Sequence, residues 1–473
     1  MNNSYNLVEK INPNIYRGYD IRAIYGQDLN EDIAYTIGVS YGKYILQKGY
    51  KKCVIGKDNR SSSDPLCDAL VAGITCTSEI EVILLGLVTT PMYYFAQKFL
   101  NDDKNEIMPG VMITASHNPK EYNGLKISFD NFGNACGQMI QDFRVFVEET
   151  TKNLINENFV KENVENEKVR YVDIRNDYLK LVKDTINLGD RKIKVVVDTA
   201  NGTASIIAKE MYEMFDLELI PLYMESDSDF PNHHPDPSVE SNNADLKKAV
   251  LENNADLGIG IDGDGDRVGI IDEKGNMIFM DFYAIIVWRH IINKVKNKRA
   301  LFDVKCSKSL PDELIKLGVE PVCYRTGNSY MKARMKEEKF EFGSELSGHV
   351  WFNDSWPNID DGLYAGLRLI EILSKTDKSI NELLEGITRY YSTPEIIVKS
   401  TDEEKFKIIE KVKNYCNEKG YKVNDVDGVR AEFDNGWALV RASNTGPNLT
   451  LRFEGITKED MESIQNEFTK LIG

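Results

Sequence analysis

One short stretch of the chain combines a hydroxyl group with a turn that would expose it. The hexapeptide Thr114-Ala115-Ser116-His117-Asn118-Pro119 follows an apolar run, PGVMI. A serine directly after a buried strand lies at the carboxyl edge of its sheet, where α/β proteins place ligands. Ser116 is therefore a candidate nucleophile, although the hexapeptide alone fits an ordinary turn serine equally well. A hydrolase triad is disfavoured, because no GxSxG elbow surrounds the serine and the adjacent His117 is not expected to reach it as a base.

A second stretch alternates acidic residues with glycines. The segment Asp262-Gly263-Asp264-Gly265-Asp266-Arg267 separates two predicted strands, DLGIGI and VGIID. In a turn that glycine allows to curl, alternate carboxylates can face one hard cation, and without a cation they would repel each other. A solvated acidic hairpin is the less favoured alternative. An EF-hand is excluded because Arg267 stands where that loop needs glycine, and the GxGxxG match at 258–263 runs into a strand instead of a helix.

Two later loops carry groups suited to a polar ligand. The loop 343–349 presents Glu345, Ser347 and His349 at alternate positions, which suits a polyol such as a sugar, although a capping segment fits as well. The turn Arg441-Ala442-Ser443-Asn444-Thr445 ends an apolar strand. Its guanidinium, hydroxyl and amide groups could hold a phosphate, and a plain polar hairpin turn is the alternative.

Basic residues near the serine complete the set. Arg22 precedes the hexapeptide, and Lys126 lies on a predicted strand, NGLKISF, ten residues after Ser116. Each alone is more often a solvated surface charge. Together, however, one serine, one cation site, a polyol loop and a phosphate clamp suit phosphoryl transfer, in which metal and cationic groups neutralise the phosphoryl oxygens.

The composition of the chain limits its partners and compartment. The 473 residues include 58 basic and 75 acidic side chains, a net charge of −17, which disfavours nucleic acid and anionic membrane as partners. Seven cysteines without a CxxC pair argue against a disulfide scaffold and for a reducing compartment. The opening segment has no apolar stretch typical of a signal peptide, and no run approaches eighteen apolar residues. We expect a cytoplasmic, multidomain enzyme.

Three regions of the chain repeat one pattern of elements. Strand-like runs begin at Lys51, Lys192 and Arg299, and each is followed by a polar loop, a helical run and a second strand. This pattern predicts three similar α/β domains with mixed or parallel sheets. After Ser392-Thr393-Pro394 the pattern changes to a small α+β layer. We expect domain boundaries near 160, 276 and 388, giving domains 1–160, 161–276, 277–388 and 389–473.

These four motifs, in this order, resemble those of the α-D-phosphohexomutase superfamily, and most closely its phosphomannomutase/phosphoglucomutase subgroup. The stretches FPNHHPDP at 230–237 and Tyr19-Asp20-Ile21-Arg22 add subgroup-level support. The resemblance covers nearly the whole chain. It implies three α/β domains and a C-terminal TATA-binding-protein-like domain around a central cleft.

The resemblance also implies a reaction and its residues. An enzyme of this kind interconverts hexose 1-phosphates and 6-phosphates of mannose or glucose through a phosphoserine and a hexose 1,6-bisphosphate, which also serves as activator. Ser116 would carry the phosphoryl group, with one Mg²⁺ held by Asp262, Asp264, Asp266 and Ser116. Arg22, Lys126, Arg267, His117 and His349 would act at the transferring phosphoryl, with Lys126 and His349 as proton-transfer candidates. Substrate contacts would come from Tyr19, Lys305, Asn328, Glu345, Ser347, Arg441, Ser443, Asn444 and Thr445. The oligomeric state is open between monomer and dimer.

The chain departs from the subgroup at a few positions. Asn328 stands where the subgroup commonly has histidine, and asparagine cannot act as an acid or base near neutral pH. Leu346 replaces the usual methionine, while Ser344 and Ala23 replace glycines. The alternatives are a phosphoglucosamine mutase, a metal-dependent sugar phosphatase, and a non-catalytic sugar-phosphate sensor. Against the phosphatase, a closed cleft with two phosphate sites should exclude water. Against the sensor, the serine, the aspartates and the clamp are all intact.

Overall fold

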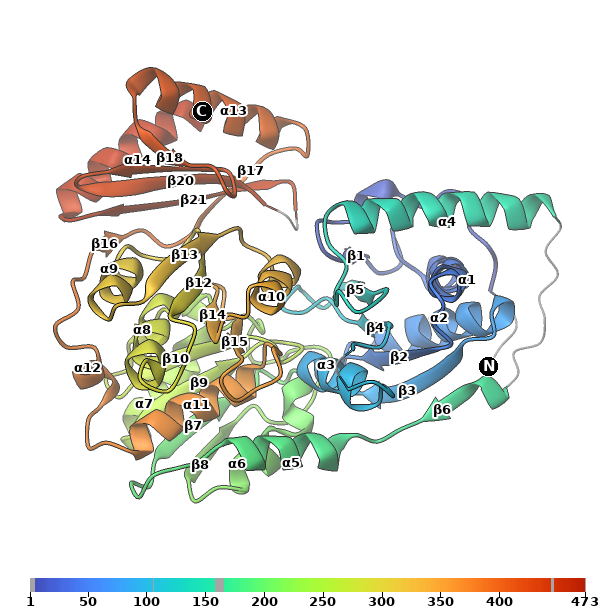
Figure 1. Cartoon of the computed structure of the whole chain (residues 1–473), viewed down its shortest axis with the longest axis horizontal. Helices are drawn as coiled ribbons and strands as arrows, with labels where there is room; N and C mark the ends of the chain where they lie inside the picture. Colours follow the sequence, from blue (N-terminus) through green and yellow to red (C-terminus); the bar gives the residue numbers. More distant parts are fainter. Residues whose placement is uncertain (1–4, 105, 158–165, 444–445, 473) are drawn as a thin grey trace. The chain divides into compact units, whose positions relative to one another are not determined.

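The computed structural model describes residues 5–104, 106–157, 166–443 and 446–472, and its elements are labelled in Figure 1. The chain forms two compact units. The first comprises Met1–Ile278, Gly348–Val350 and Ser355–Ile380, and the second comprises Phe279–Ser347, Trp351–Asp354 and Asn381–Gly473. Among the helices of the described ranges, none has both the length and the apolar character needed to cross a bilayer.

The first unit begins with a mixed six-stranded sheet of order β1-β5-β4-β2-β3-β6. Its strands are β1 (Ile21–Ile24), β2 (Lys52–Lys57), β3 (Glu81–Leu87), β4 (Gly110–Ile113), β5 (Tyr122–Ser128) and β6 (Val169–Tyr171). Its helices are α1 (Glu31–Gln47), α2 (Ser63–Thr77), α3 (Thr90–Phe99) and α4 (Gln138–Asn156). Strand β5 is antiparallel to β1 and β4, and the other neighbours are parallel.

Strand β2 shows how both faces of this sheet are covered. Its side chains alternate between two covered faces. Cys53 and Ile55 join the core that α1 and α2 build. On the other face, a Cβ added at Gly56 would lie only 2.8 Å from Val88 and 3.6 Å from Tyr93 of α3. Because β2 and β4 are parallel neighbours, the loops that follow them emerge at the same edge of a sheet buried on both sides.

The second sheet of the first unit has the order β11-β10-β9-β7-β8. Its strands are β7 (Lys194–Asp198), β8 (Glu218–Leu222), β9 (Leu257–Ile261), β10 (Val268–Asp272) and β11 (Met277–Ile278). Its helices are α5 (Arg175–Thr185), α6 (Ala208–Glu213) and α7 (Ala244–Asn253). Strands β7, β8 and β9 run parallel, whereas β9 and β10 form an antiparallel hairpin, so this sheet is also mixed.

Helix α11 (Gly362–Ser374) belongs to this first unit although it follows the loop 343–349 in sequence. It packs on β9 and β10. Its approach is close, because a Cβ at Gly366 would lie 2.4 Å from the Tyr212 hydroxyl and 2.8 Å from Ile259. The helix therefore needs glycine at this point.

The second unit holds two further sheets, of which only residue Val350 is assigned to the first unit. The third sheet, of order β13-β12-β14-β15, contains β12 (Arg299–Asp303), β13 (Glu320–Tyr324), β14 (Phe342–Ser344) and β15 (Val350–Phe352). Helices α8 (Met280–Ile291), α9 (Ser309–Lys316), α10 (Asn328–Glu337) and α12 (Ile380–Leu383) accompany it. The fourth sheet contains β16 (Tyr391–Ser392), β17 (Ile396–Lys399), β18 (Lys422–Asn424), β19 (Val429–Phe433), β20 (Gly436–Ala442) and β21 (Asn448–Gly455). Helices α13 (Glu404–Lys419) and α14 (Lys458–Ile472) pack on this antiparallel sheet around Phe453 and Phe468.

The predicted fold class is confirmed. The three expected repeats are the parallel pairs β2/β3, β7/β8 and β12/β13, each with a helix between its strands. The fourth sheet is the expected α+β layer. The domain boundaries near 160, 276 and 388 stay predictions, and the first of them falls within residues 158–165, outside the described ranges.

Candidate active site

Ser116 lies at the carboxyl end of β4 in a strained turn. Its φ is +53°, a left-handed conformation that costs a non-glycine residue energy. The residue is 2 % exposed, and its amide donates to Thr114 Oγ1 at 2.8 Å. Its hydroxyl donates to Asp262 Oδ2 at 3.0 Å. The turn thus aims the serine oxygen at the acidic loop.

His117 departs from the sequence-based expectation. Its Nδ1 lies 3.2 Å from Ser116 Oγ, so the prediction that the neighbouring ring would not reach the serine is wrong. The left-handed backbone at Ser116 redirects the residue that follows it. Burial lowers the pKa of His117 well below its usual value, and Arg267 and Arg22 lower this pKa further. Because the hydroxyl proton goes to Asp262, a neutral ring would donate from Nδ1 to the serine oxygen.

The acidic loop connects β9 and β10, the strands of the hairpin. Asp262, Asp264 and Asp266 are fully buried, and their carboxylate oxygens lie within 4.8 Å of one another. Gly265 has a φ of +87°, and a Cβ at Gly263 would lie 2.5 Å from the Ser116 carbonyl. The glycines therefore allow both the curl of the loop and its close approach to the serine turn.

A nearby cation partly compensates the negative charge of these carboxylates. Lys126 on β5 donates to Asp264 at 2.8 Å and to Asp266 at 2.5 Å. These two partners outweigh the effect of burial and raise the pKa of Lys126 well above its usual value. Burial, together with Asp264 and Asp266, raises the pKa of Asp262. For Asp266, Lys126 and His349 outweigh burial and lower the pKa. Burial and the neighbouring carboxylates therefore favour a proton or a cation at Asp262, the residue that faces Ser116.

The donor set fits a hard divalent cation. Asp264 Oδ1 and Asp266 Oδ1 are buried and accept no hydrogen bond from the described residues. Buried carboxylate oxygens seldom lack a donor or a metal. Three carboxylates and a hydroxyl oxygen are the oxygen ligands that Mg²⁺ and Ca²⁺ prefer. The chain thus presents a cluster that could bind a metal beside Ser116.

Arg267 and His349 form a chain of contacts along one side of the cluster. Arg267 Nε donates to His349 Nε2 at 3.0 Å and lies 3.8 Å from Asp262 Oδ2. His349 Nδ1 lies 2.9 Å from Asp360 Oδ2 and 3.6 Å from Asp266 Oδ1. Because Nε2 accepts from the guanidinium, the proton of a neutral ring is on Nδ1 and points to Asp360.

Arg22 and Tyr19 lie at the start of the first sheet. Arg22 on β1 is buried; it donates to Asn118 Oδ1 of the serine hexapeptide at 2.9 Å and to Asp20 at 2.5 Å. Tyr19 lies two residues before β1 and is half-buried. The structure thus brings Arg22, Lys126, Arg267, His117 and His349 to the serine and the aspartates within the first unit.

Residues 343–347 of the predicted sugar loop lie in the second unit, whereas His349 belongs to the first. Glu345 is 2 % exposed; its two oxygens accept from the Gly327 amide at 2.7 Å and from Ser347 Oγ at 3.0 Å. Asn328 is the first residue of α10, directly after that glycine. The loop 343–347 and the start of α10 therefore form one cluster of polar groups.

The predicted phosphate clamp is in the same unit. Arg441 on β20 is buried and pairs with Asp427 at 2.9 Å. Arg441 Nη2 donates to none of the described residues. Asp427 outweighs the effect of burial and raises the pKa of Arg441. The Ser443 amide donates to the Asn448 carbonyl, whereas Asn444 and Thr445 lie outside the described residues.

Lys305 follows β12 in the second unit. Its Nζ lies 2.7 Å from Glu395 and 3.8 Å from Asp303. These carboxylates outweigh the effect of burial and raise the pKa of Lys305. Lys305 is therefore a buried cation held by two acids.

Several residues at these sites were absent from the sequence-based set. Thr90 Oγ1 and Thr114 Oγ1 donate to Asp264 Oδ2 at 2.7 and 3.2 Å. In the second unit, Asp303 accepts from Thr326 Oγ1 and from the Leu346 amide. Asp303 ends β12, so the rule that polar residues at strand ends line ligand sites could have found it.

Comparison with known proteins divides the chain into four parts, one for each of the four sheets described above. Four domain models match: phosphoglucomutase/phosphomannomutase α/β/α domain I at residues 13–153, domain II at 176–275, domain III at 280–391, and the C-terminal domain at 395–471. Together they account for most of the chain.

Relatives extend over nearly the full length. The phosphomannomutase/phosphoglucomutase of Pseudomonas syringae is 38% identical over 99% of this chain and 97% of its own. The phosphoglucomutase of Neisseria gonorrhoeae is 36% identical over 98% and 97%. The crystal structure of a phosphoglucomutase/phosphomannomutase family protein from Burkholderia thailandensis superimposes with a TM-score of 0.86 at 31% identity, covering 98% of each chain. The chain belongs to the phosphoglucomutase/phosphomannomutase family.

Proposed function

We propose that Ser116 is the phosphoryl carrier of a hexose-phosphate mutase. Membership of this family makes the chain an isomerase that interconverts hexose 1-phosphate and hexose 6-phosphate. The observation that carries the role of Ser116 is its hydroxyl, placed 3.0 Å from Asp262 in a buried cluster of three carboxylates. Phosphoserine there would lie beside both a cation site and the Lys126 ammonium.

The aspartates support one bound Mg²⁺. Asp262, Asp264 and Asp266, with an oxygen on Ser116, would hold it. The two buried carboxylate oxygens that accept no hydrogen bond from the described residues support this assignment. When bound, Mg²⁺ supplies charge that withdraws electron density from phosphoryl oxygens. Lys126, Arg22 and Arg267 add cationic groups around the same position.

The reaction consists of two phosphoryl transfers, the first from Ser116 to the sugar and the second from the sugar to Ser116. In the first, the bond between phosphorus and the Ser116 oxygen breaks, and a bond forms between phosphorus and the free hydroxyl oxygen of a hexose monophosphate. The proton of that hydroxyl passes to a group of the chain, for which His349 and His117 are the candidates. Lys126 is the third candidate from the sequence, but its raised pKa keeps it an ammonium that cannot accept a proton. In the second transfer, the bond between the other phosphorus of the hexose 1,6-bisphosphate and its sugar oxygen breaks, and that phosphorus bonds to the Ser116 oxygen. The proton returns to the sugar oxygen that is freed. Free hexose 1,6-bisphosphate would act as the activator, because it can phosphorylate Ser116 again after the phosphoryl group has been lost.

The second unit supplies the candidate sugar and phosphate contacts. Glu345 and Ser347 suit hydrogen bonds to sugar hydroxyls. Arg441, with Ser443, Asn444 and Thr445, suits the phosphate that does not react, because a guanidinium binds phosphate at two oxygens. Lys305, Asn328 and Tyr19 would add substrate contacts. In this arrangement one clamp serves both half-reactions.

Hexose phosphates are the partners we infer, in a cytoplasmic setting. The seven cysteines are free thiols, as expected in a reducing compartment. Mannose and glucose phosphates are the substrates we favour, because the relatives carry those names. Glucosamine phosphate is the competing substrate.

A side-by-side rate comparison tests this function. Glucose 1-phosphate, mannose 1-phosphate and glucosamine 1-phosphate would be supplied with Mg²⁺ and a trace of glucose 1,6-bisphosphate, and free phosphate would be assayed in the same tubes. We expect isomerisation of the first two sugars without phosphate release. Preference for glucosamine phosphate would assign the competing substrate, and net phosphate release would contradict the mutase mechanism.

A further inference from the structure

We propose that Arg60 is a positioning residue that holds the Ser116 turn, and that the neighbouring Asn59 ties this turn to the acidic loop. Neither residue touches the reacting atoms. The inference rests on the proposed role of Ser116 as phosphoryl carrier, and it adds the element that fixes the distance between the serine and the aspartates.

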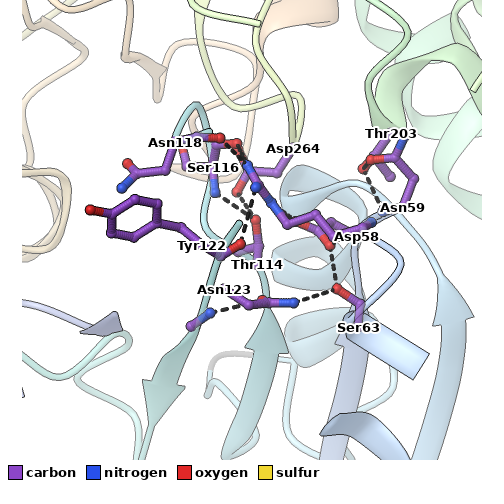
Figure 2. Close-up of polar contacts among 12 residues, drawn as sticks. Asp58, Asn59, Ser63, Thr114, Ser116, Asn118, Tyr122, Asn123, Thr203 and Asp264 are labelled. Carbon is purple, nitrogen blue, oxygen red and sulfur yellow. Dashed lines mark hydrogen bonds and ion pairs between the residues drawn. The ribbon is translucent and has the colours of Figure 1, made fainter. Parts of the chain in front are cut away.

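The Arg60 guanidinium donates hydrogen bonds to the backbone carbonyl oxygens of the serine turn. Its Nη2 donates to the Ser116 carbonyl at 2.8 Å and to the Asn118 carbonyl at 2.6 Å. Its Nη1 donates to the Pro119 carbonyl at 2.7 Å and to the Tyr122 carbonyl at 3.1 Å. Figure 2 labels Ser116, Asn118 and Tyr122, whose carbonyls accept three of these hydrogen bonds. Arg60 is 3 % exposed, so water does not compete for these contacts.

Arg60 is itself fixed from two further sides. Asp58 accepts from Arg60 Nε at 3.1 Å and from the Arg60 amide at 3.1 Å, and Ser63 Oγ donates to the same carboxylate. The Phe230 ring lies with its centroid 5.4 Å from the guanidinium. Phe230 opens the FPNHHPDP stretch, so this contact gives that stretch a part in holding the turn.

This geometry explains how the strained turn persists. The carbonyls of the turn are drawn to one side by the guanidinium, while the Ser116 hydroxyl faces Asp262 on another. A φ of +53° at Ser116 needs surrounding contacts that outweigh its cost. Lysine could not replace arginine here, because an ammonium has three donors from one atom and cannot span four carbonyls and a carboxylate.

Asn59 connects the same segment to the acidic loop. Its amide donates to Thr203 Oγ1 at 3.1 Å, and its side chain donates to the Asn201 carbonyl at 2.9 Å. The Thr203 amide in turn donates to the Gly263 carbonyl at 2.8 Å. Gly263 is the residue whose Cβ would collide with the Ser116 carbonyl. Consecutive residues 59 and 60 therefore hold the two loops that must meet. Figure 2 draws the contact between Asn59 and Thr203.

The test compares R60K with a matched control, R191K, in the full-length protein. Arg191 also binds backbone carbonyls, those of Thr376 and Lys378, and pairs with an aspartate, but it lies away from Ser116 in sequence and contacts. We expect R60K to lower kcat about 100-fold, as a displacement near 1 Å can do, and to change KM for glucose 1-phosphate by less than about threefold. R191K should keep the wild-type kcat. A wild-type kcat in R60K, or equal losses in both variants, would overturn the proposal.

R60A separates positioning from a general loss of folding. Added guanidinium ion should restore part of its kcat, because the ion can occupy the space that the side chain leaves, and an ammonium salt of equal concentration should not. Failure of guanidinium to restore activity in a variant whose melting temperature matches that of R191K would count against the proposal. Mass spectrometry of the wild-type protein tests the proposed function separately. Absence of phosphate on Ser116 would show that Ser116 is not the phosphoryl carrier, whereas phosphate on Ser116 would confine the failure to the role of Arg60.

Discussion

The Ser116 hydroxyl donates to Asp262 Oδ2 at 3.0 Å although the two residues are 146 positions apart in the chain. One follows strand β4 of the first sheet and the other follows strand β9 of the second. Two strand ends thus present a hydroxyl and a carboxylate to each other with little room between the loops. This contact is the structural basis for assigning phosphoryl transfer to this position.

Replacing Asp264 with asparagine should weaken the cation site. The substitution removes one negative charge but keeps the size of the side chain, and Lys126, Thr90 and Thr114 lose a charged acceptor. We expect the Mg²⁺ concentration for half-maximal rate to rise about 10- to 100-fold and kcat to fall. The measurement is a Mg²⁺ titration of the mutase rate.

Asp256→Asn is the control for this titration. Asp256 is likewise an ion-paired aspartate of the first unit, bound to Arg191. Among the described residues its side-chain hydrogen bonds come from Arg191 and the Lys194 amide and none involves the three loop aspartates, so its replacement should leave the Mg²⁺ dependence unchanged. If Asp264→Asn also left it unchanged, the acidic loop would not be the metal site.

Replacing Arg441 with alanine should weaken the binding of both sugar phosphates to a similar extent. The guanidinium pairs with Asp427 and retains a donor, Nη2, that none of the described residues uses. Loss of a charge-assisted hydrogen bond to phosphate corresponds to about a 10- to 100-fold increase in KM. We expect this increase for glucose 1-phosphate and mannose 1-phosphate alike.

Lys413→Ala controls for loss of a positive charge from the same unit, since Lys413 is an exposed cation paired with Asp425. It should leave both KM values as in the wild type. An effect of Arg441→Ala confined to one sugar would show that Arg441 distinguishes sugars instead of holding their shared phosphate.

Asp361 should give the first unit a pH-dependent stability. It caps α11 by accepting from the Tyr364 amide, and it also accepts from the Tyr178 hydroxyl. Burial raises the pKa of Asp361 to about 7, and the two hydrogen bonds only partly offset this effect. Because the folded state holds the proton more tightly than the unfolded state, this group stabilises the fold below its unfolded pKa, and the stabilisation is lost as pH rises through about 7.

Asp361→Asn tests this dependence. Asparagine can still cap the helix through its side-chain oxygen, but it does not titrate. Between pH 5 and pH 8 the wild type should lose roughly 2–3 kcal/mol more stability than the variant. Thermal unfolding at several pH values measures the difference. Parallel pH profiles for the two proteins would show that Asp361 is ionised in both folded and unfolded states throughout this range.

The local chemistry of the site could be predicted from the sequence. Ser116 and the three aspartates lie in short loops directly after apolar strands, and a strand end is a local pattern that fixes where a side chain emerges. The three parallel strand pairs were predictable for the same reason, because each repeat is contiguous in sequence. The short range of these signals explains why they succeed.

Other features depend on contacts between distant segments. Asp360 was not predicted to contact His349, because the sequence does not indicate that α11 packs on β9 and β10. The contact of His117 with Ser116 depends on a positive φ that serine seldom adopts. Arg60 follows strand β2, the parallel neighbour of β4, so the strand-end rule could have found it once the strand order was known.

The most direct test of the central claim is intact-mass and peptide mass spectrometry of the wild type and Ser116→Ala, combined with their mutase rates. After incubation with glucose 1,6-bisphosphate and Mg²⁺, the wild type should carry one phosphoryl group, located on Ser116. Ser116→Ala should carry none and should lose activity on the order of 10⁴-fold or more, while its melting temperature stays close to that of the wild type. A Ser116→Ala protein that isomerises glucose 1-phosphate at the wild-type rate, or a wild type phosphorylated only elsewhere, would contradict the account.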